Sequence, residues 1–243
     1  MATDTSWPIR SLHQIELTSH CNLRCVYCPS PNLGREKLHM TRETFMRTLE
    51  WVRYFVNDGT QGELNLAGIG ESTMHPDLIE FVGLAREALG WSQRICFATN
   101  GLLVTEEMAK ALKPYKPEIW VSLHRPEKGK HAVDLLGEYG MLAGISTSPA
   151  TDAVDWAGQI DWKVTSRMFG DPCDWRLGGW VFVMADGRLT TCCFDQGAKG
   201  VLGHVNDPIG SVRGRAYELC KTCHQDIGFE GFRDRVEGRV RVG

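Results

Sequence analysis

Three closely spaced cysteines near the N-terminus constrain this chain more than any other feature. Cys21, Cys25 and Cys28 follow a strand-like run at residues 13–18, with three and then two residues between them. Cysteine thiolates hold iron–sulfur clusters, and a cluster of four irons normally takes four such ligands. A local set of three leaves one iron open to a substrate or cofactor, as three protein ligands leave an open position in catalytic zinc sites. The alternatives are a zinc site lacking its fourth ligand and buried structural thiols, although this spacing followed by Pro29 is not that of a zinc knuckle.

The trio, with the aromatic Tyr27 directly before its last cysteine, resembles the cluster-binding loop of the radical S-adenosylmethionine (SAM) enzymes. The resemblance implies a 4Fe–4S cluster on Cys21, Cys25 and Cys28, with SAM on the open iron and Tyr27 beside the cofactor. It also implies reductive cleavage of SAM to a 5′-deoxyadenosyl radical, which abstracts a hydrogen atom from the substrate. In such enzymes the cofactor performs the difficult step, while the protein supplies position, electrostatics and exclusion of water.

The composition of the whole chain is that of an ordinary globular protein: 243 residues, 42% of them hydrophobic and 23% charged. No apolar run approaches the roughly 18–20 residues of a membrane span, and residues 1–10 lack the apolar core of a secretory signal. We therefore expect a cytoplasmic protein without a membrane partner.

The net charge of −3 provides no basic stripe, which argues only weakly against a nucleic-acid substrate. Nine cysteines, an odd number without an export signal, favour metal binding over disulfides.

Strand-like and helical patterns alternate from residue 15 to about residue 165, which implies parallel strands joined by right-handed helical crossovers. After the first strand, the pattern predicts strands at residues 63–67, 94–98, 118–123, 142–146 and 160–164. It predicts helices that begin after Thr41 and Thr105, which are plausible N-caps, and further helices at 77–89 and about 129–139.

Six such units are too few for a closed eight-fold barrel, which needs about 250 residues, so the fold class is α/β with a partial (β/α)6 barrel. We assign the barrel to residues 1–168 and a small second domain to residues 169–243. In parallel arrangements of this kind the loops after the strands carry the chemistry. The cysteine trio lies in the first of these loops.

Glycines and a carboxylate follow the second predicted strand. Gly70 and Glu71 match the Gly-Gly-Glu segment with which the radical SAM family binds the amino group of SAM, although Gly68 is offset by Ile69. A carboxylate accepts charge-assisted hydrogen bonds from an ammonium group, and glycines let the backbone approach a ligand closely. The alternative is a plain pair of loop glycines.

Polar residues also end the third, fourth and sixth predicted strands. The family resemblance supports ribose binding by Ser122 and by Asn100, whereas His124 has no clear role. Lys163 and Arg167, at the end of the predicted sixth strand, are candidates to bind the cofactor carboxylate or the substrate. The alternative for these two basic residues is a solvated position.

A second set of cysteines brackets a predicted hairpin. Residues 180–184 and 188–191 flank an Asp-Gly turn, and the surrounding cysteines are Cys173, Cys192, Cys220 and Cys223. Gly187, four residues and Cys192 resemble the glycine–cysteine spacing of SPASM and twitch domains, which bind auxiliary clusters. Too few cysteines remain for the two clusters of a full SPASM domain, so one auxiliary 4Fe–4S cluster, the twitch arrangement, is expected.

Three alternatives stay open for this second set. Cys193 adjoins Cys192, and an exchange of the two as ligand is open, although the glycine spacing selects Cys192. Four cysteines also make a structural zinc site. Cys220, Cys223 and His224 match the attachment motif of c-type haem, which requires an exported chain.

The sequence therefore predicts a radical SAM enzyme that performs a two-electron oxidation of an unactivated C–H position, the auxiliary cluster accepting an electron. Its size and plan resemble the aminocyclitol dehydrogenases of the twitch subgroup. The substrate, a small molecule or a biopolymer, is unknown, and the chemistry implies a reducing partner such as flavodoxin or ferredoxin. The alternatives are radical modification or redox-neutral rearrangement of a peptide, nucleotide or nucleic acid, and a non-catalytic iron–sulfur or zinc protein. We expect no leader-recognition extension, which argues against a peptide.

Overall fold

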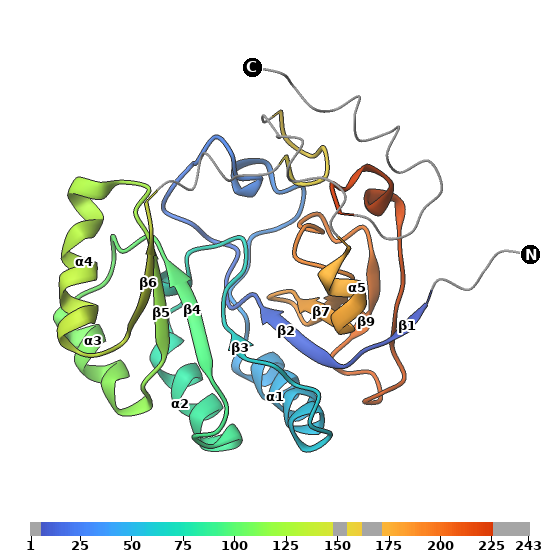
Figure 1. The fold of residues 1–243 in the computed structure, drawn as a ribbon, viewed down its shortest axis with the longest axis horizontal. Coiled ribbons are helices and arrows are strands. Elements are labelled where there is room, and N and C mark those ends of the chain that lie inside the picture. Colours follow the sequence, from blue (N-terminus) through green and yellow to red (C-terminus); the bar gives the residue numbers. More distant parts are fainter. Residues whose placement is uncertain (1–5, 148–154, 162–171, 226–243) are drawn as a thin grey trace, which may run out of the picture.

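One eight-stranded sheet organises the computed structural model, which describes residues 6–147, 155–161 and 172–225 (Figure 1). The strand order across the sheet is β6-β5-β4-β3-β2-β7-β8-β9. A separate antiparallel pair joins β1 (Trp7–Pro8) to β10 (Arg213–Gly214). The strands of the main sheet are β2 (Ser11–Ile15), β3 (Leu64–Asn65), β4 (Ile95–Thr99), β5 (Glu118–Ser122), β6 (Leu142–Ser146), β7 (Trp180–Val183), β8 (Arg188–Thr190) and β9 (Val201–His204).

In the order across the sheet, every neighbouring pair from β6 as far as β7 is parallel. The pairs β7–β8 and β8–β9 are antiparallel. Parallel strands with helical crossovers are the arrangement of a partial barrel, so the predicted fold class is confirmed. The predicted hairpin is β7–β8, and its first strand pairs with β2. The second set of cysteines is therefore attached to the same sheet as the trio.

Helices α1 to α4 lie along the outer side of the parallel strands, whereas the short helix α5 packs beside β7 (Figure 1). Among the described helices, none combines the length and apolar character required to cross a bilayer. The described α-helices are α1 (Arg42–Asn57), α2 (Leu78–Leu89), α3 (Glu106–Leu112), α4 (Pro126–Glu138) and α5 (Asp174–Gly178). The short 3₁₀ turns are η1 (Ser30–Asn32), η2 (Ser72–Met74), η3 (Lys113–Tyr115) and η5 (Glu218–Thr222).

Local chemistry explains where these helices begin. The Thr41 hydroxyl accepts a hydrogen bond from the Thr44 N–H at 3.2 Å, and Thr105 does the same for Met108, so both predicted N-caps are present. Helix α4 begins at Pro126, three residues before the predicted start, because proline suits the first helical position. Of the predicted strand at 160–164, residues 160 and 161 belong to no strand, and the rest lies outside the described residues.

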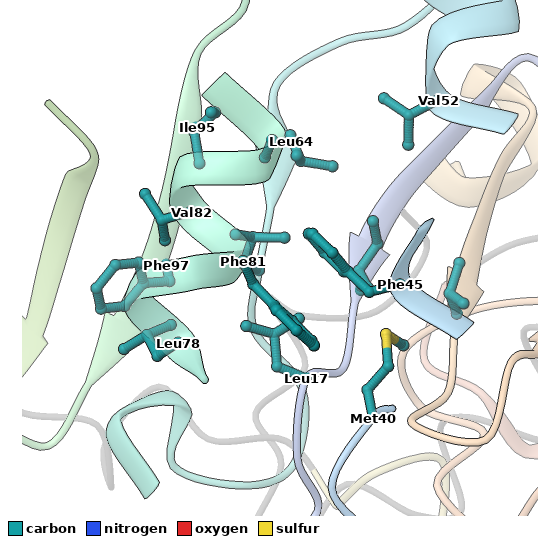
Figure 2. Close-up of a cluster of buried hydrophobic side chains, with 14 of the residues drawn as sticks. Leu17, Met40, Phe45, Val52, Leu64, Leu78, Phe81, Val82, Ile95 and Phe97 are labelled. Atoms are coloured by element: carbon teal, nitrogen blue, oxygen red, sulfur yellow. The ribbon is translucent and has the colours of Figure 1, made fainter. Parts of the chain in front are cut away.

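The core lies between these helices and the sheet. Phe45 of α1 and Phe81 of α2 stack with their ring centroids 4.3 Å apart, and both are fully buried. Figure 2 shows the two rings beside Leu17, which follows β2, and Met40, which precedes α1. The core thus fixes the start of the loop that carries the cysteine trio.

A buried ion pair fastens that loop from its other end. The Arg35 Nη2 donates to both carboxylate oxygens of Glu16, at 2.7 and 2.8 Å, and both side chains are buried. Glu16 also accepts hydrogen bonds from the backbone N–H groups of Ile69 and Ala185. The Arg35 Nε donates to the carbonyl of Gln196 at 2.7 Å. This Glu16–Arg35 junction therefore joins the ends of β2, β3 and β7 to the segment after Cys193.

We predict that Arg35→Met lowers the free energy of unfolding of the iron-free protein by about 3–5 kcal/mol, because it leaves the Glu16 carboxylate buried without its partner. The double variant Glu16→Gln/Arg35→Met recovers part of that loss, since no buried charge remains. Urea denaturation measures both. The control is Arg42→Met, which removes an exposed pair with Glu80 and costs at most about 1 kcal/mol. Equal losses for the Arg35 and Arg42 variants contradict the prediction.

Candidate active site

A cavity of about 390 Å³ lies where the loops after β2, β3, β4 and β5 meet. The structure brings to it every described residue that was predicted for the first cluster and for SAM. Lys163 and Arg167, the remaining candidates, lie outside the described residues. The lining comprises Cys21, Leu23, Cys25, Tyr27, Cys28, Gly68, Ile69, Gly70, Glu71, Ala98, Thr99, Asn100, Ser122, His124 and Trp156.

The three cysteine side chains share one wall of this cavity. Backbone N–H groups point at two of the sulfurs, from Leu23 to Cys21 at 3.4 Å and from Ser30 to Cys28 at 3.5 Å. Burial raises the pKa of the Cys21 thiol and raises that of Cys28 to about 11, and the neighbouring thiols add to both shifts. Neighbouring thiolates repel one another, and a cationic iron centre bound by them would provide the compensating charge. The trio therefore fits a cluster.

Glu71 is the most strongly held side chain of the cavity. Its Oε1 accepts hydrogen bonds from the Thr73 N–H at 3.1 Å, the Thr73 hydroxyl at 2.6 Å and the Thr99 hydroxyl at 2.7 Å. Its Oε2 accepts one, from the Asn100 N–H at 2.7 Å. A carboxylate oxygen has about two lone-pair sites, so Oε2 can accept a further bond from a ligand. The carboxylate thus connects the loops after β3 and β4 and keeps one acceptor position for the cavity.

The loop that contains Glu71 approaches the cysteine loop without space between them. A Cβ atom on Gly70 would lie 2.1 Å from the Thr18 carbonyl oxygen and 2.6 Å from that of His20. The Glu71 N–H donates to the same His20 carbonyl at 2.8 Å. Gly70 therefore permits a backbone-to-backbone contact directly before Cys21, a structural role additional to the predicted contact with cofactor.

Asn100 connects the cysteine loop to the end of β4. Its side-chain Nδ2 donates to the Asn22 Oδ1 at 2.7 Å, and its Oδ1 accepts from the Leu102 N–H at 3.0 Å. These contacts use the Asn100 side chain to position the loop that holds Cys21. Ser122, at the end of β5, lines the cavity as predicted.

Three ring-bearing side chains, Tyr27, His124 and Trp156, also line the cavity. The Tyr27 hydroxyl forms a short hydrogen bond with His124 Nδ1. Burial raises the pKa of Tyr27 and lowers that of His124, so both are neutral near pH 7. The Trp156 indole N–H donates to the Tyr27 carbonyl at 3.0 Å. Sequence reasoning left His124 without a role and missed Trp156, which lies in an irregular stretch with no periodic pattern.

The second set of cysteines surrounds another, apolar cavity. Cys173, Cys192, Cys220 and Cys223 all line it, together with side chains that include Trp7, Trp175, Phe194, Tyr217 and Leu219. Burial raises the pKa of Cys220 to about 11 and that of Cys223 to about 12. The open space is about 20 Å³, room for about one water molecule, so a 4Fe–4S cluster fits here only if the surrounding side chains move apart. In the described part of the chain, no group of three His, Cys, Asp or Glu side chains is arranged so that it could hold a single metal ion.

The position of Cys193 differs from that of Cys192. Cys193 does not line the cavity, although burial and the nearby Cys223 raise its pKa to about 12. Cys192 lines it, and its thiol pKa is raised by burial and then by Cys193, Cys223 and Cys220. Cys192 therefore lines the cavity with the other three cysteines, whereas Cys193 does not line it but lies close enough to Cys223 and Cys173 for both to raise its pKa. His224 follows Cys223 and contacts Phe194 with ring centroids 5.4 Å apart.

The family model of the radical SAM superfamily matches residues 15–172, and the chain belongs to this superfamily. Membership implies a 4Fe–4S cluster and SAM, for which the cavity described above supplies three thiols and a strongly held carboxylate.

Three sequence relatives match parts of the chain. The chain is 35% identical over 101 residues to the tungsten-containing aldehyde ferredoxin oxidoreductase cofactor-modifying protein of Pyrococcus furiosus, covering 40% of this chain and 26% of that protein. It is 30% identical over 149 residues to molybdenum cofactor biosynthesis protein 1 of Bos taurus, covering 59% and 22%. It is 30% identical over 134 residues to the GTP 3′,8-cyclase of Aquifex aeolicus, covering 53% and 40%. The chain thus spans less than half the length of these relatives.

Solved structures share the fold over nearly the whole chain. BtrN in complex with AdoMet and 2-DOIA superposes with a TM-score of 0.68 at 18% identity, covering 95% of this chain and 87% of that one. Native anSMEcpe with bound AdoMet gives 0.62 at 16% identity, covering 96% and 84%. At these identities the similarity establishes the fold alone.

We predict that Gly70→Ala displaces the cysteine loop, because the added methyl group meets two backbone carbonyls. The expected result is loss of at least half of the iron bound by the trio and a lower free energy of unfolding by about 1–3 kcal/mol. Gly62→Ala is the matched control, since a Cβ there meets nothing within 4 Å. Iron assay after anaerobic reconstitution measures the first effect and urea denaturation the second. Unchanged iron binding in the Gly70 variant refutes this account of the contact.

Proposed function

We propose that the chain is an oxidoreductase that removes two electrons from a C–H position of its substrate, using SAM, a cluster on Cys21, Cys25 and Cys28, and an auxiliary cluster. Bound together, the first cluster and SAM supply the 5′-deoxyadenosyl radical that takes a hydrogen atom from the substrate. The observation that carries the oxidative assignment is the convergence of Cys173, Cys192, Cys220 and Cys223 on one cavity. Four ligands complete the coordination of a cluster, so its role is to accept an electron rather than to bind a substrate.

The residues of the first cavity have distinct tasks in this proposal. Glu71 accepts a hydrogen bond from the amino group of SAM through Oε2, because Oε1 already has three donors. Ser122 binds a ribose hydroxyl, and Asn100 supports the cysteine loop as well as the ribose. The aromatic Tyr27 and His124 side chains exclude water from this side. Lys163 and Arg167 remain candidates for the carboxylate of SAM or for the substrate.

A small polar alcohol is the substrate class that we favour. The fold neighbour with the higher TM-score of the two described above was solved with AdoMet and 2-DOIA, and this chain spans 87% of that protein. The single additional cysteine group, Cys173, Cys192, Cys220 and Cys223, supports the resemblance to aminocyclitol dehydrogenases of the twitch subgroup.

A second candidate function is redox-neutral rearrangement of a nucleotide. It is favoured by the names of the sequence relatives, GTP 3′,8-cyclase and molybdenum cofactor biosynthesis protein 1, at 30% identity. In this alternative the second set of cysteines binds a cluster that holds substrate or binds zinc.

Both candidate functions require an electron donor. A groove lined by Cys25 and Cys28 offers a surface to which a donor protein could bind. Cys25 and Cys28 line both the first cavity and a groove of about 760 Å³ on the other side of the loop. Arg24 and Lys199 contribute positive charge to this groove and Asp161 negative charge. We propose that a reducing protein such as flavodoxin or ferredoxin docks at this side of the loop.

The first test counts iron and sulfide after anaerobic reconstitution, beside a variant with Cys21, Cys25 and Cys28 changed to Ala. Two clusters predict about eight irons in the wild type and about four in the variant. Zinc is assayed in parallel. If the wild type binds about four irons, the variant binds none and zinc is present in both, the auxiliary cluster is contradicted. The redox-neutral rearrangement then becomes the preferred function over the oxidation.

The second test follows the products from candidate aminocyclitols and nucleotides. Oxidation predicts a ketone or aldehyde two hydrogens lighter than the substrate, with one 5′-deoxyadenosine formed per turnover. Mass spectrometry measures the product, and chromatography counts 5′-deoxyadenosine. Omitting the reductant is the control. A product isomeric with the substrate, or regeneration of SAM, refutes the oxidation.

A further inference from the structure

A single turn at residues 155–161 contacts three cysteine-bearing segments: residues 21–28, the segment directly after Cys193, and residues 220–223. Trp156 lines the first cavity, while Ala157, the next residue, lines the second. The turn closes on Asp155, whose carbonyl accepts hydrogen bonds from the N–H groups of Gly158 and Ile160. It is therefore a compact wall between the two cysteine sites.

The backbone of this turn is unusual. Trp156, Ala157 and Gly158 have φ angles of 53°, 60° and 86°, in the left-handed region. Residues with a Cβ atom rarely adopt this conformation, and they keep it only where surrounding contacts enforce it. Two consecutive non-glycine residues with such angles therefore indicate strong contacts on both sides of the turn.

The contacts on the first side run to the trio. The Trp156 indole N–H donates to the carbonyl of Tyr27 at 3.0 Å, between Cys25 and Cys28. Its ring also faces the first cavity, so a molecule bound there lies against it.

The contacts on the second side run to the other cysteines. The Thr222 hydroxyl, between Cys220 and Cys223, donates to the Ala157 carbonyl at 2.7 Å. The Gln159 amide donates to the carbonyl of Phe194 at 2.7 Å, and the Phe194 ring packs edge-on against Trp156 with centroids 5.4 Å apart. Phe194 directly follows the Cys192–Cys193 pair.

We propose that this turn couples the two cysteine sites, with Trp156 as the positioning residue, so that loosening the ligands of one site loosens those of the other. Thermodynamic coupling is reciprocal, so the effect must run in both directions. The inference goes beyond the proposed function, because it holds whether the second site contains a cluster, zinc or free thiols. It implies that a ligand in the first cavity alters the second site through the Trp156 indole.

The test uses the full-length reconstituted protein, challenged anaerobically with an iron chelator and iodoacetamide. Peptide mass spectrometry records how fast each cysteine is alkylated. Thr222→Val removes the hydroxyl that donates to the Ala157 carbonyl and, at 3.1 Å, to the Leu219 carbonyl of its own segment. We expect it to accelerate alkylation of Cys25 and Cys28 by about three- to tenfold, the effect of one lost hydrogen bond on an opening equilibrium. Trp156→Phe removes the indole N–H at the first site and accelerates alkylation of Cys220 and Cys223 similarly.

Two controls separate coupling from general loosening. Trp91→Phe changes a tryptophan that is 65% exposed and lines neither cavity, and it leaves all rates unchanged. Cys96 is buried in β4 and reports opening of the whole chain. The proposal is overturned if each substitution affects only the cysteines on its own side, or if Cys96 accelerates as much as the ligand cysteines. These outcomes do not depend on whether the oxidation proposal holds.

Discussion

The buried contact between Glu16 and Arg35 determines how the loops of this protein meet. Glu16 follows β2, and its carboxylate accepts bonds from residues after β3 and β7, while Arg35 reaches the carbonyl of Gln196. A charged pair that is removed from water contributes little net stability, but it enforces one arrangement because any other leaves a buried charge unpaired. Here the enforced arrangement holds the trio and the segment after Cys193 in fixed relation.

The parallel pairing of β2 and β7 brings the loops that carry the two sets of cysteines to the same edge of the sheet. Because β7 is parallel to β2, the ends of both strands point to the same edge, and the loops that follow them lie together. The turn after β7 contains Ala185, whose N–H binds Glu16, and the strand β8 then leads to Cys192. The second set of cysteines is thus placed by an extension of the barrel sheet.

Much of the first cavity was predictable from the sequence. Tyr27, Gly70, Glu71 and Asn100 follow strands that the alternating pattern identifies and Ser122 lies at the end of one, and parallel strands bring such residues to one edge. What the pattern could not show is how the side chains divide their hydrogen bonds. Glu71 matches a motif for binding an ammonium, yet three of its four hydrogen bonds come from Thr73 and Thr99, which no motif marks. The Glu16–Arg35 pair and the Trp156 turn depend on contacts between distant segments and have no periodic signal.

The two cysteine sites differ in the number of thiols, and this number decides whether a bound cluster would keep an open position for a ligand. Three thiols leave a position on iron for a ligand, and the cavity beside them has room for one. Four thiols around a narrow apolar space would leave no such position, so a cluster bound there would exchange electrons with its surroundings but bind nothing else. Trp156 lines the first cavity and the adjacent Ala157 lines the second, so a cluster in the second cavity would be placed to act as acceptor for an electron that leaves a substrate in the first. A redox-neutral reaction has no use for such an acceptor, and for this reason we place the oxidation first.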